Sequence, residues 1–146
     1  MTPITGSIEI VRPPQAVFDY VANVRRRDEW QDAVEQIQVV TPDIAEVGME
    51  VLEKRRVPGG ARTFRWQVTE YEAPKLWGFR GIGNPINAVA RMTFTPLDGG
   101  TKTSATFEID FEAQGLKKIM AISARRATGN EVPRDLARLK QQLETN

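Results

Sequence analysis

The sequence predicts an α+β domain in which a curved antiparallel sheet of six or seven strands surrounds one long C-terminal helix. Two observations lead to this class. Between residues 47 and 113, five segments alternate apolar and polar side chains and are separated by turns rich in Gly, Pro and Asp. After Gly115 the spacing of apolar residues changes to that of a helix and keeps it to the end of the chain.

The N-terminal elements follow from the same periodicities. Residues 6–11 alternate and form a first strand, which ends at Arg12-Pro13-Pro14 because proline cannot donate to a strand ladder. Residues 13–23 carry apolar side chains at helical spacing and predict a short amphipathic helix. The segment RRRDEWQD, 25–32, predicts a second, shorter helix, and residues 33–40 predict an extended strand.

Four turns separate the remaining strands into hairpins. They are Pro58-Gly59-Gly60, Ala73-Pro74, Gly83-Asn84-Pro85 and Asp98-Gly99-Gly100. The last strand has apolar residues such as Phe107 and Ile109 on one face and charged residues such as Glu108 on the other. This alternation indicates a sheet with one face in water.

The C-terminal helix has two apolar stripes that are separated by possible helix breakers. The first stripe holds Leu116, Ile119, Met120, Ser123 and Ala127, and the second holds Val132, Leu136, Leu139 and Leu143. Gly129-Asn130 and Pro133 leave two interpretations open: a new helix capped by Asn130, or one helix that continues with a kink. Together the stripes cover roughly 28 residues, about 42 Å of helix.

One helix is only about 10 Å across, and it cannot fill the concave face of so wide a sheet. Either aromatic side chains fill the remaining space, or a cavity is left there. The segment from Phe64 to Gly81 holds the aromatics that decide between these, because Phe64, Trp66, Trp77 and Phe79 lie on apolar strand faces.

Composition excludes several classes of function. The 146 residues suit one domain, 1–146, and the net charge of +1 argues against a nucleic-acid binder. The chain has no Cys and no His, which removes the commonest metal ligands and general base, so we predict no metal site, no cofactor and no catalytic residue. The sequence shows no signal peptide and no apolar stretch long enough to span a bilayer, so we expect a cytoplasmic location.

The ordered segments of the chain resemble a known superfamily. They are SIEIVRPPQAVFDYVANV, EW at Trp30, VGM at Gly48, VTEYEAPKLWGFR, RMTFTPLDGGTKTSATFEIDF and DLARLKQQLE. In this order they resemble the START-related, birch-pollen-allergen-like (SRPBCC) superfamily, and within it the bacterial polyketide cyclase/dehydrase and lipid transport proteins. The resemblance implies a helix-grip fold that encloses a hydrophobic pocket for lipids, polyketides, sterols or similar molecules.

We therefore expect a ligand-binding set on the inner face of the sheet and on the helix. It comprises Trp30, Met49, Val51, Arg55, Phe64, Trp66, Trp77, Phe79, Met92, Phe107, Ile109, Ile119 and Met120. Each of the aromatics and methionines could instead be packed core. Glu53 and Arg55 share the parity of Val51, so they either enter the cavity as a charged pair or are solvated at a twisted strand end.

Three functions remain open. The first is binding or transport of a small hydrophobic molecule. The second is a cyclase or dehydrase reaction in the same cavity, which an inward-facing Glu53 without a basic partner would favour. The third is binding of a partner protein without a ligand, for which we expect a filled interior and an exposed apolar patch. The basic residues of the last helix are either a solvated face or a surface for transient membrane contact. The ligand and the oligomeric state cannot be read from the sequence.

Overall fold

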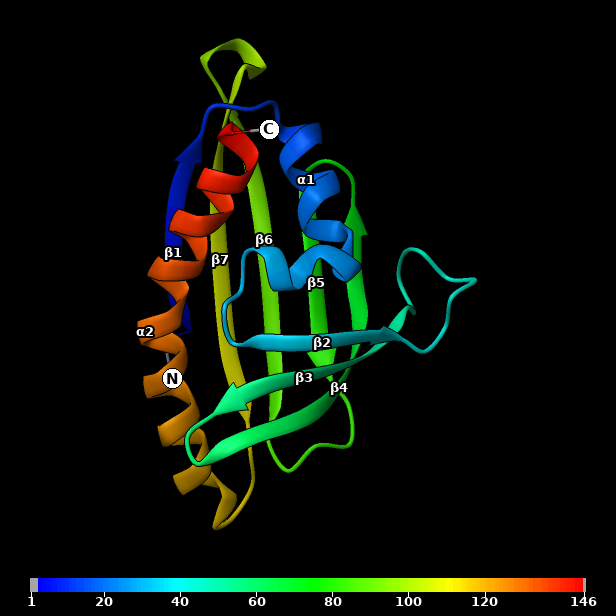
Figure 1. Cartoon of the computed structure of the whole chain (residues 1–146), viewed down its shortest axis with the longest axis vertical. Helices are drawn as coiled ribbons and strands as arrows, with labels where there is room; N and C mark the ends of the chain where they lie inside the picture. Colours follow the sequence, from blue (N-terminus) through cyan, green and yellow to red (C-terminus); the bar gives the residue numbers. More distant parts are fainter. Residues whose placement is uncertain (1–2, 146) are drawn as a thin grey trace.

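The computed structural model describes residues 3–145 and has the predicted α+β helix-grip architecture (Figure 1). The strands are β1 (Ile4–Ile10), β2 (Val34–Val39), β3 (Glu50–Val57), β4 (Gly60–Glu72), β5 (Leu76–Gly81), β6 (Asn87–Leu97) and β7 (Lys102–Glu112). The helices are α1 (Pro14–Ala22), the 3₁₀ helices η1 (Val24–Glu29) and η2 (Asp98–Gly100), and α2 (Lys117–Glu144). Residues 1, 2 and 146 of the predicted single domain lie outside the described residues.

The described strands form one seven-stranded antiparallel sheet in the order β1-β7-β6-β5-β4-β3-β2. Strands β2 to β7 follow one another as a meander of hairpins, as predicted, and β1 joins the free edge of β7 with Ile4 opposite Ile109. The second predicted helix is the 3₁₀ helix η1, which ends at Glu29, so Trp30 follows this helix instead of lying within it.

The sheet bends strongly, which gives it a concave face. In Figure 1, β2 and β3 run nearly across the direction of β6 and β7. The register shifts between Val34 and Gln36 on β2 and between Val68 and Glu70 on β4. Such bulges increase the local right-handed twist, which accounts for part of the change in direction.

Two helices cover different parts of the concave face. Helix α1 lies over β5 and β6, where Phe18 makes edge-to-face contacts with Tyr71 at 5.1 Å and Phe94 at 5.7 Å between ring centroids. Helix α2 lies along β1 and β7 (Figure 1). The part of the concave face between the two helices is covered by neither.

Helix α2 is held mainly by its C-terminal half. Val132, Leu136, Leu139 and Leu143 are buried there, as their coiled-coil-like spacing predicts. Gly6 on β1 allows the helix to approach closely, because a Cβ atom at this position would lie 2.7 Å from Cγ1 of Val132 and 3.0 Å from Cδ1 of Leu136. No helix among residues 3–145 is long and apolar enough to cross a bilayer.

The structure decides between the two interpretations of the C-terminal segment. Helix α2 runs without interruption from Lys117 to Glu144, with Pro133 inside it. Because Pro133 has no amide hydrogen, the carbonyl of Gly129 cannot receive its usual intrahelical bond. The helix therefore has a local weak point close to its middle.

We predict opposite effects for alanine at the two glycines that bear on α2. Gly6→Ala inserts a methyl group against Val132 and Leu136, so it should lower the free energy of unfolding by about 1–3 kcal/mol. Gly129→Ala has open space around its Cβ and should raise that free energy by about 0.5–1 kcal/mol through helix propensity. Urea unfolding followed by circular dichroism measures both changes. Equal stabilities for the two variants would contradict this account of how α2 packs on β1.

Candidate functional site

A cavity of about 270 Å³ lies between the concave face of the sheet and α2. Its walls are mainly aromatic and aliphatic. They include Phe64, Trp66, Phe79, Ala88, Phe107, Ile109 and Phe111 from the sheet, and Met120, Ala124, Ala127, Val132 and Leu136 from α2. The uncovered space between sheet and helix is thus only partly filled by side chains.

Two connections between strands complete the lining. Val57, the last residue of β3, and Pro58 come from the β3–β4 hairpin, and Pro85 and Ile86 come from the loop between β5 and β6. Asn84 fixes this second loop to β4: its Nδ2 donates to the carbonyl of Arg65 at 2.8 Å. Its Oδ1 accepts from the backbone N–H of Arg65 at 3.1 Å. The amide therefore has a structural partner on each side, in agreement with a turn-shaping role.

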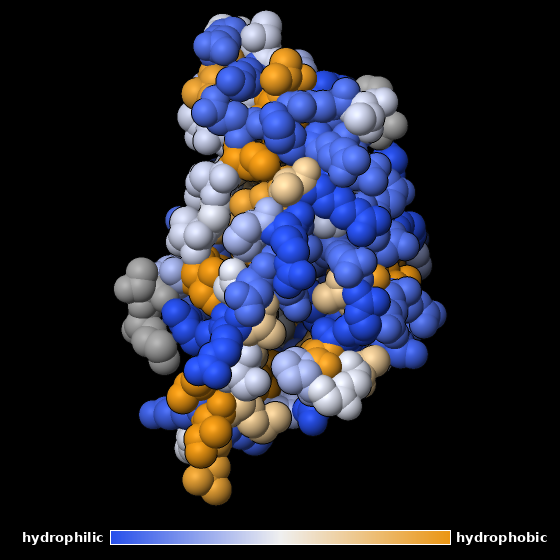
Figure 2. Space-filling model, turned by 60° about the vertical axis from the view of Figure 1, so that its left-hand side comes forward, coloured by the Kyte–Doolittle hydropathy of each residue, from blue (hydrophilic) through white to orange (hydrophobic). Residues whose placement is uncertain are grey.

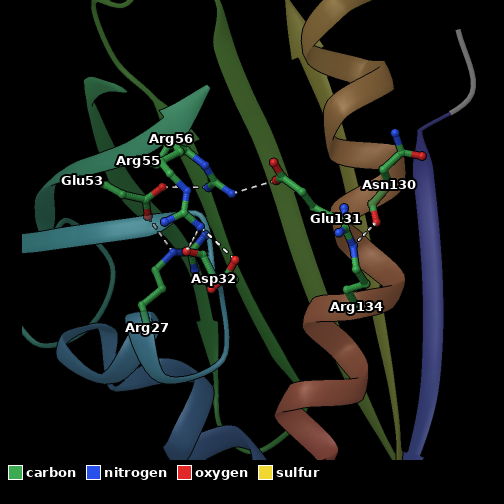
Figure 3. Close-up of polar contacts among 8 residues, drawn as sticks. All are labelled: Arg27, Asp32, Glu53, Arg55, Arg56, Asn130, Glu131 and Arg134. Atoms are coloured by element: carbon green, nitrogen blue, oxygen red, sulfur yellow. Dashed lines mark hydrogen bonds and ion pairs between the residues drawn. The ribbon is translucent and has the colours of Figure 1, made fainter. Parts of the chain in front are cut away.

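A cluster of charged side chains forms the polar part of the cavity wall (Figure 3). Arg27 of η1 donates from Nε to Oε1 of Glu53 on β3 at 2.7 Å. Arg55 of β3 donates from Nη1 to the other carboxylate oxygen of Glu53 at 2.8 Å. The same guanidinium donates from Nη2 to Glu131 of α2 at 3.0 Å. This chain of ion pairs joins three elements that are distant in sequence.

Arg27 is surrounded by aromatic rings. Its Cζ lies 5.1 Å from the ring centroids of Trp66 and Phe79, and 5.9 Å from those of Trp30 and Trp77. Aromatic faces attract a desolvated cation, which offsets part of the cost of burying this guanidinium. Burial lowers the pKa of Arg27, but the ordinary value is so high that the side chain stays protonated. Trp66 of β4 and Phe79 of β5 thus hold the Arg27 guanidinium in place and also line the cavity.

Glu53 faces inward and is only 3% exposed. It is therefore not solvated at a twisted strand end, and it enters the cavity wall as part of a charged pair. Burial raises the pKa of its carboxyl group, but the charges of Arg27 and Arg55 outweigh that effect and the net pKa is lowered. Both carboxylate oxygens are occupied by guanidinium donors. Glu53 is therefore an ionised structural partner, and it does not meet the condition that would favour it as a general base.

Asp135 is a carboxyl group of the cavity lining with a raised pKa. It lies on α2, four residues after Glu131, and lines the cavity. Burial, reinforced by the charge of Glu131 and opposed by Arg55, Arg27 and a backbone hydrogen bond from Asp32, raises the pKa of Asp135 to about 6. A carboxyl group of this pKa can exist in either protonation state near neutral pH.

Two tryptophans carry buried donors without acceptors. Nε1 of Trp66 and Nε1 of Trp77 find no hydrogen-bond partner within residues 3–145. The indole nitrogen is a donor only, and buried polar groups without partners are uncommon. Trp66 lines the cavity, whereas Trp77 belongs to the adjacent core.

The structure brings most of the expected ligand-binding set together. The cavity is lined by Trp30, Arg55, Phe64, Trp66, Phe79, Phe107, Ile109 and Met120. Met49, Val51, Trp77 and Met92 are instead buried in the hydrophobic core outside the lining. Ile119 points away from the cavity and is 70% exposed, because it lies about 100° around the helix from Met120.

Sequence reasoning missed Arg27, Glu131 and Asp135. Arg27 is the third of three consecutive arginines, and no periodicity distinguishes it from Arg25 and Arg26, which are exposed. Asp135 and Glu131 carried a readable signal, since they continue the helical spacing of Ala127 on the inner face. Both residues are charged, so neither belongs to the apolar stripes that predicted the inner face of the C-terminal helix.

Glu53→Gln should destabilise the protein strongly. It leaves Arg27 buried without its counter-charge, and breaking a buried ion pair in this way costs about 3–5 kcal/mol. Glu112→Gln is the matched control, because Glu112 pairs with Arg80 at an exposed site and such pairs contribute only about 0–1 kcal/mol. Urea unfolding of both variants tests the difference. A similar, small loss for Glu53→Gln would show that the buried cluster is not a major stabilising element.

The raised pKa of Asp135 predicts how the free energy of unfolding depends on pH. Between pH 3.8 and about 6 the folded state holds a proton on Asp135 that the unfolded state has lost, so this group makes the stability fall as pH rises through that window. Asp135→Asn removes the effect. As the pH rises through this window, the free energy of unfolding of Asp135→Asn should therefore increase by about 1–2 kcal/mol relative to that of wild type. This value allows for the partial solvent exposure of Asp135.

Urea unfolding of wild type and Asp135→Asn at a series of pH values measures this difference. Asp43→Asn serves as a control, because Asp43 is exposed in the connection between β2 and β3. A difference between wild type and Asp135→Asn that stays constant with pH would contradict the raised pKa.

Comparisons with known proteins agree with this fold. The Zhui aromatase/cyclase from Streptomyces sp. R1128 superposes with a TM-score of 0.78 at 14% identity, covering 97% of this chain and 93% of that chain. A START superfamily protein from Mycobacterium smegmatis gives a TM-score of 0.76 at 9% identity, covering 99% of each chain. Likeness at such low identity shows the fold alone.

A sequence relative is the toxin Rv0910 of Mycobacterium tuberculosis, which is 24% identical over 83 residues. The match covers 57% of this chain and 58% of the toxin, so it spans less than two thirds of that relative's length. The family described as polyketide cyclase / dehydrase and lipid transport matches residues 1–144, almost the whole chain. The protein therefore belongs to the polyketide cyclase/dehydrase and lipid transport family.

Proposed function

We propose that this protein binds a small, mostly apolar molecule in the cavity between the sheet and α2. The observation that carries the proposal is the space itself: about 270 Å³ with largely aromatic and aliphatic walls. Ligand pockets typically span roughly 300–1,000 Å³. The cavity is slightly smaller than that range, so it favours a small ligand or one that extends past the two loops.

Burial of apolar ligand surface supplies the driving force, at about 25 cal/mol per Å² before the costs of ordering. Orientation comes from the few polar groups of the lining. Arg27, Glu53 and Arg55 already occupy one another, so they offer little free hydrogen-bonding capacity. Asp135 and the indole N–H of Trp66 are better suited, and together they would favour a ligand with a hydroxyl or carbonyl oxygen.

Transport of such a molecule within the cytoplasm is the finer part of the proposal. It is supported by the family description, which includes lipid transport. The third interpretation, a partner-binding domain without a ligand, predicted a filled interior together with an exposed apolar patch. The cavity disfavours that interpretation.

A cyclase or dehydrase reaction in the same cavity is the second candidate. Asp135 favours it, because a carboxyl group with a pKa of about 6 can accept or donate a proton near neutral pH. Such a reaction also needs a donor for the developing enolate oxygen, which the Trp66 N–H could provide. The family description includes this activity, and a similar fold occurs in an aromatase/cyclase.

Filling the cavity tests the binding proposal. Ala127→Trp places an indole inside the lining, and it should weaken the uptake of a fluorescent fatty-acid probe at least tenfold by removing the space. Ala137→Trp is the matched control, since Ala137 lies on the exposed side of the same helix. Probe titration and native mass spectrometry give the readouts. No probe uptake and no co-purifying mass in wild type would refute the proposal.

Asp135→Asn separates the two candidate functions. A binding protein should turn over no polyketide-like substrate, and Asp135→Asn should keep its affinity for the probe within a few-fold because burial of apolar surface supplies most of that affinity. An enzyme should keep binding but lose turnover of a polyketide-like substrate, with the pH profile of wild type showing a limb near 6. Turnover unchanged in Asp135→Asn would exclude this residue as the acid or base.

A further inference from the structure

Leu116, directly before α2, and the first turns of α2 expose apolar side chains that nothing in residues 3–145 covers. Leu116 is 88% exposed, Ile119 70% and Ile122 55%. Figure 2 shows hydrophobic surface at the end of the molecule where α2 begins. The buried residues of the helix, by contrast, lie mostly in its C-terminal half. We call Leu116, Ile119 and Ile122 the apolar tip.

Basic residues surround the apolar tip. Residues 113–130 contain Lys117, Lys118, Arg125 and Arg126 and no acidic residue. The acidic residues just before this segment, Asp110 and Glu112, form ion pairs with Arg125 and Arg80. The surface at this end of α2 is therefore both apolar and positively charged.

Helical spacing places the two kinds of side chain on one face. Ile119 and Ile122 are three residues apart, and Lys118 and Arg126 lie four residues before and four residues after Ile122. Residues at these spacings are neighbours on a helix surface. Lys118 and Arg126 are exposed, as are the two isoleucines. Exposed apolar side chains beside basic ones suit contact with the anionic head groups of a bilayer.

We propose that the apolar tip, with Lys118 and Arg126, docks on the surface of an anionic lipid bilayer. The apolar side chains would enter the boundary between head groups and acyl chains, and the basic side chains would contact anionic head groups. Met120, in the same turns, lines the cavity. Docking would therefore bring one wall of the cavity close to the bilayer, although the proposal does not depend on the identity of a ligand.

A second copy of this chain fits the surface less well. A stable protein interface buries roughly 800 Å² on each partner, whereas the apolar tip covers only two helical turns, about 10 Å in length. A symmetric dimer through this face would also bring Lys118 and Arg126 close to the same residues of its partner. Like charges across an interface oppose association.

Vesicle flotation with the full chain tests the proposal. We expect binding to vesicles of phosphatidylcholine with phosphatidylserine, and much weaker binding to vesicles of phosphatidylcholine alone. Neutralising two basic residues in Lys118→Gln/Arg126→Gln should weaken partitioning about twenty-five-fold, given roughly a fivefold effect for each basic residue near the surface. Ile119→Ser/Ile122→Ser should also weaken it, and added salt should reduce binding by wild type.

The control Arg25→Gln/Lys75→Gln removes the same charge from exposed positions outside this surface and should bind like wild type. Thermal unfolding should show that all variants stay folded, because the replaced side chains are exposed. Equal binding of wild type to both kinds of vesicle, or equal loss in the control, would overturn the proposal. A dimer that dissociates in Ile119→Ser/Ile122→Ser without vesicle binding would overturn it in favour of self-association.

Discussion

The ion pairs of Arg27, Glu53, Arg55 and Glu131, of which Arg27–Glu53 is fully buried and the others half-buried, are the constraint on which the site depends. They join η1, β3 and α2 in a region where apolar side chains do not close the space between sheet and helix. Desolvation of these charges is costly, and the cost is offset only because both oxygens of Glu53 have guanidinium partners. Ion pairs as well as apolar packing therefore hold this wall of the cavity in place.

The same cluster decides which groups are available to a guest molecule. Glu53 and Arg55 have the chemical types of an acid and an oxyanion partner, but they are occupied by each other and by Arg27 and Glu131. Asp135 is different, because burial keeps a proton on it up to a pH of about 6. The family to which the chain belongs is described by both lipid transport and cyclase or dehydrase chemistry.

Helix α2 serves two purposes along its length. Its C-terminal half packs on β1, where Gly6 permits close contact, and so completes the hydrophobic core. Its N-terminal half contributes Met120 and Ala124 to the cavity and leaves Ile119 and Ile122 exposed. The two halves meet near Gly129 and Pro133, where the hydrogen bonding of the helix is locally weaker. The cavity wall on α2 thus has a firmly packed part at Val132 and Leu136 and a less firmly packed part at Met120 and Ala124.

Periodicity along the sequence was enough to determine the order of strands and helices, the inner face of β4 and β7, and the presence of a helix too narrow for its sheet. These features are local, because side-chain alternation and helical spacing are repeated over many residues. Only the tertiary structure decided that Trp77 and Met92 are core, that Ile119 is exposed and that Arg27 is buried among aromatic rings. Those outcomes depend on the bend of the sheet and the rotation of α2 about its axis. The bulges on β2 and β4 contribute to the bend, and the close approach of Val132 to Gly6 helps to place α2; no local pattern encodes either feature.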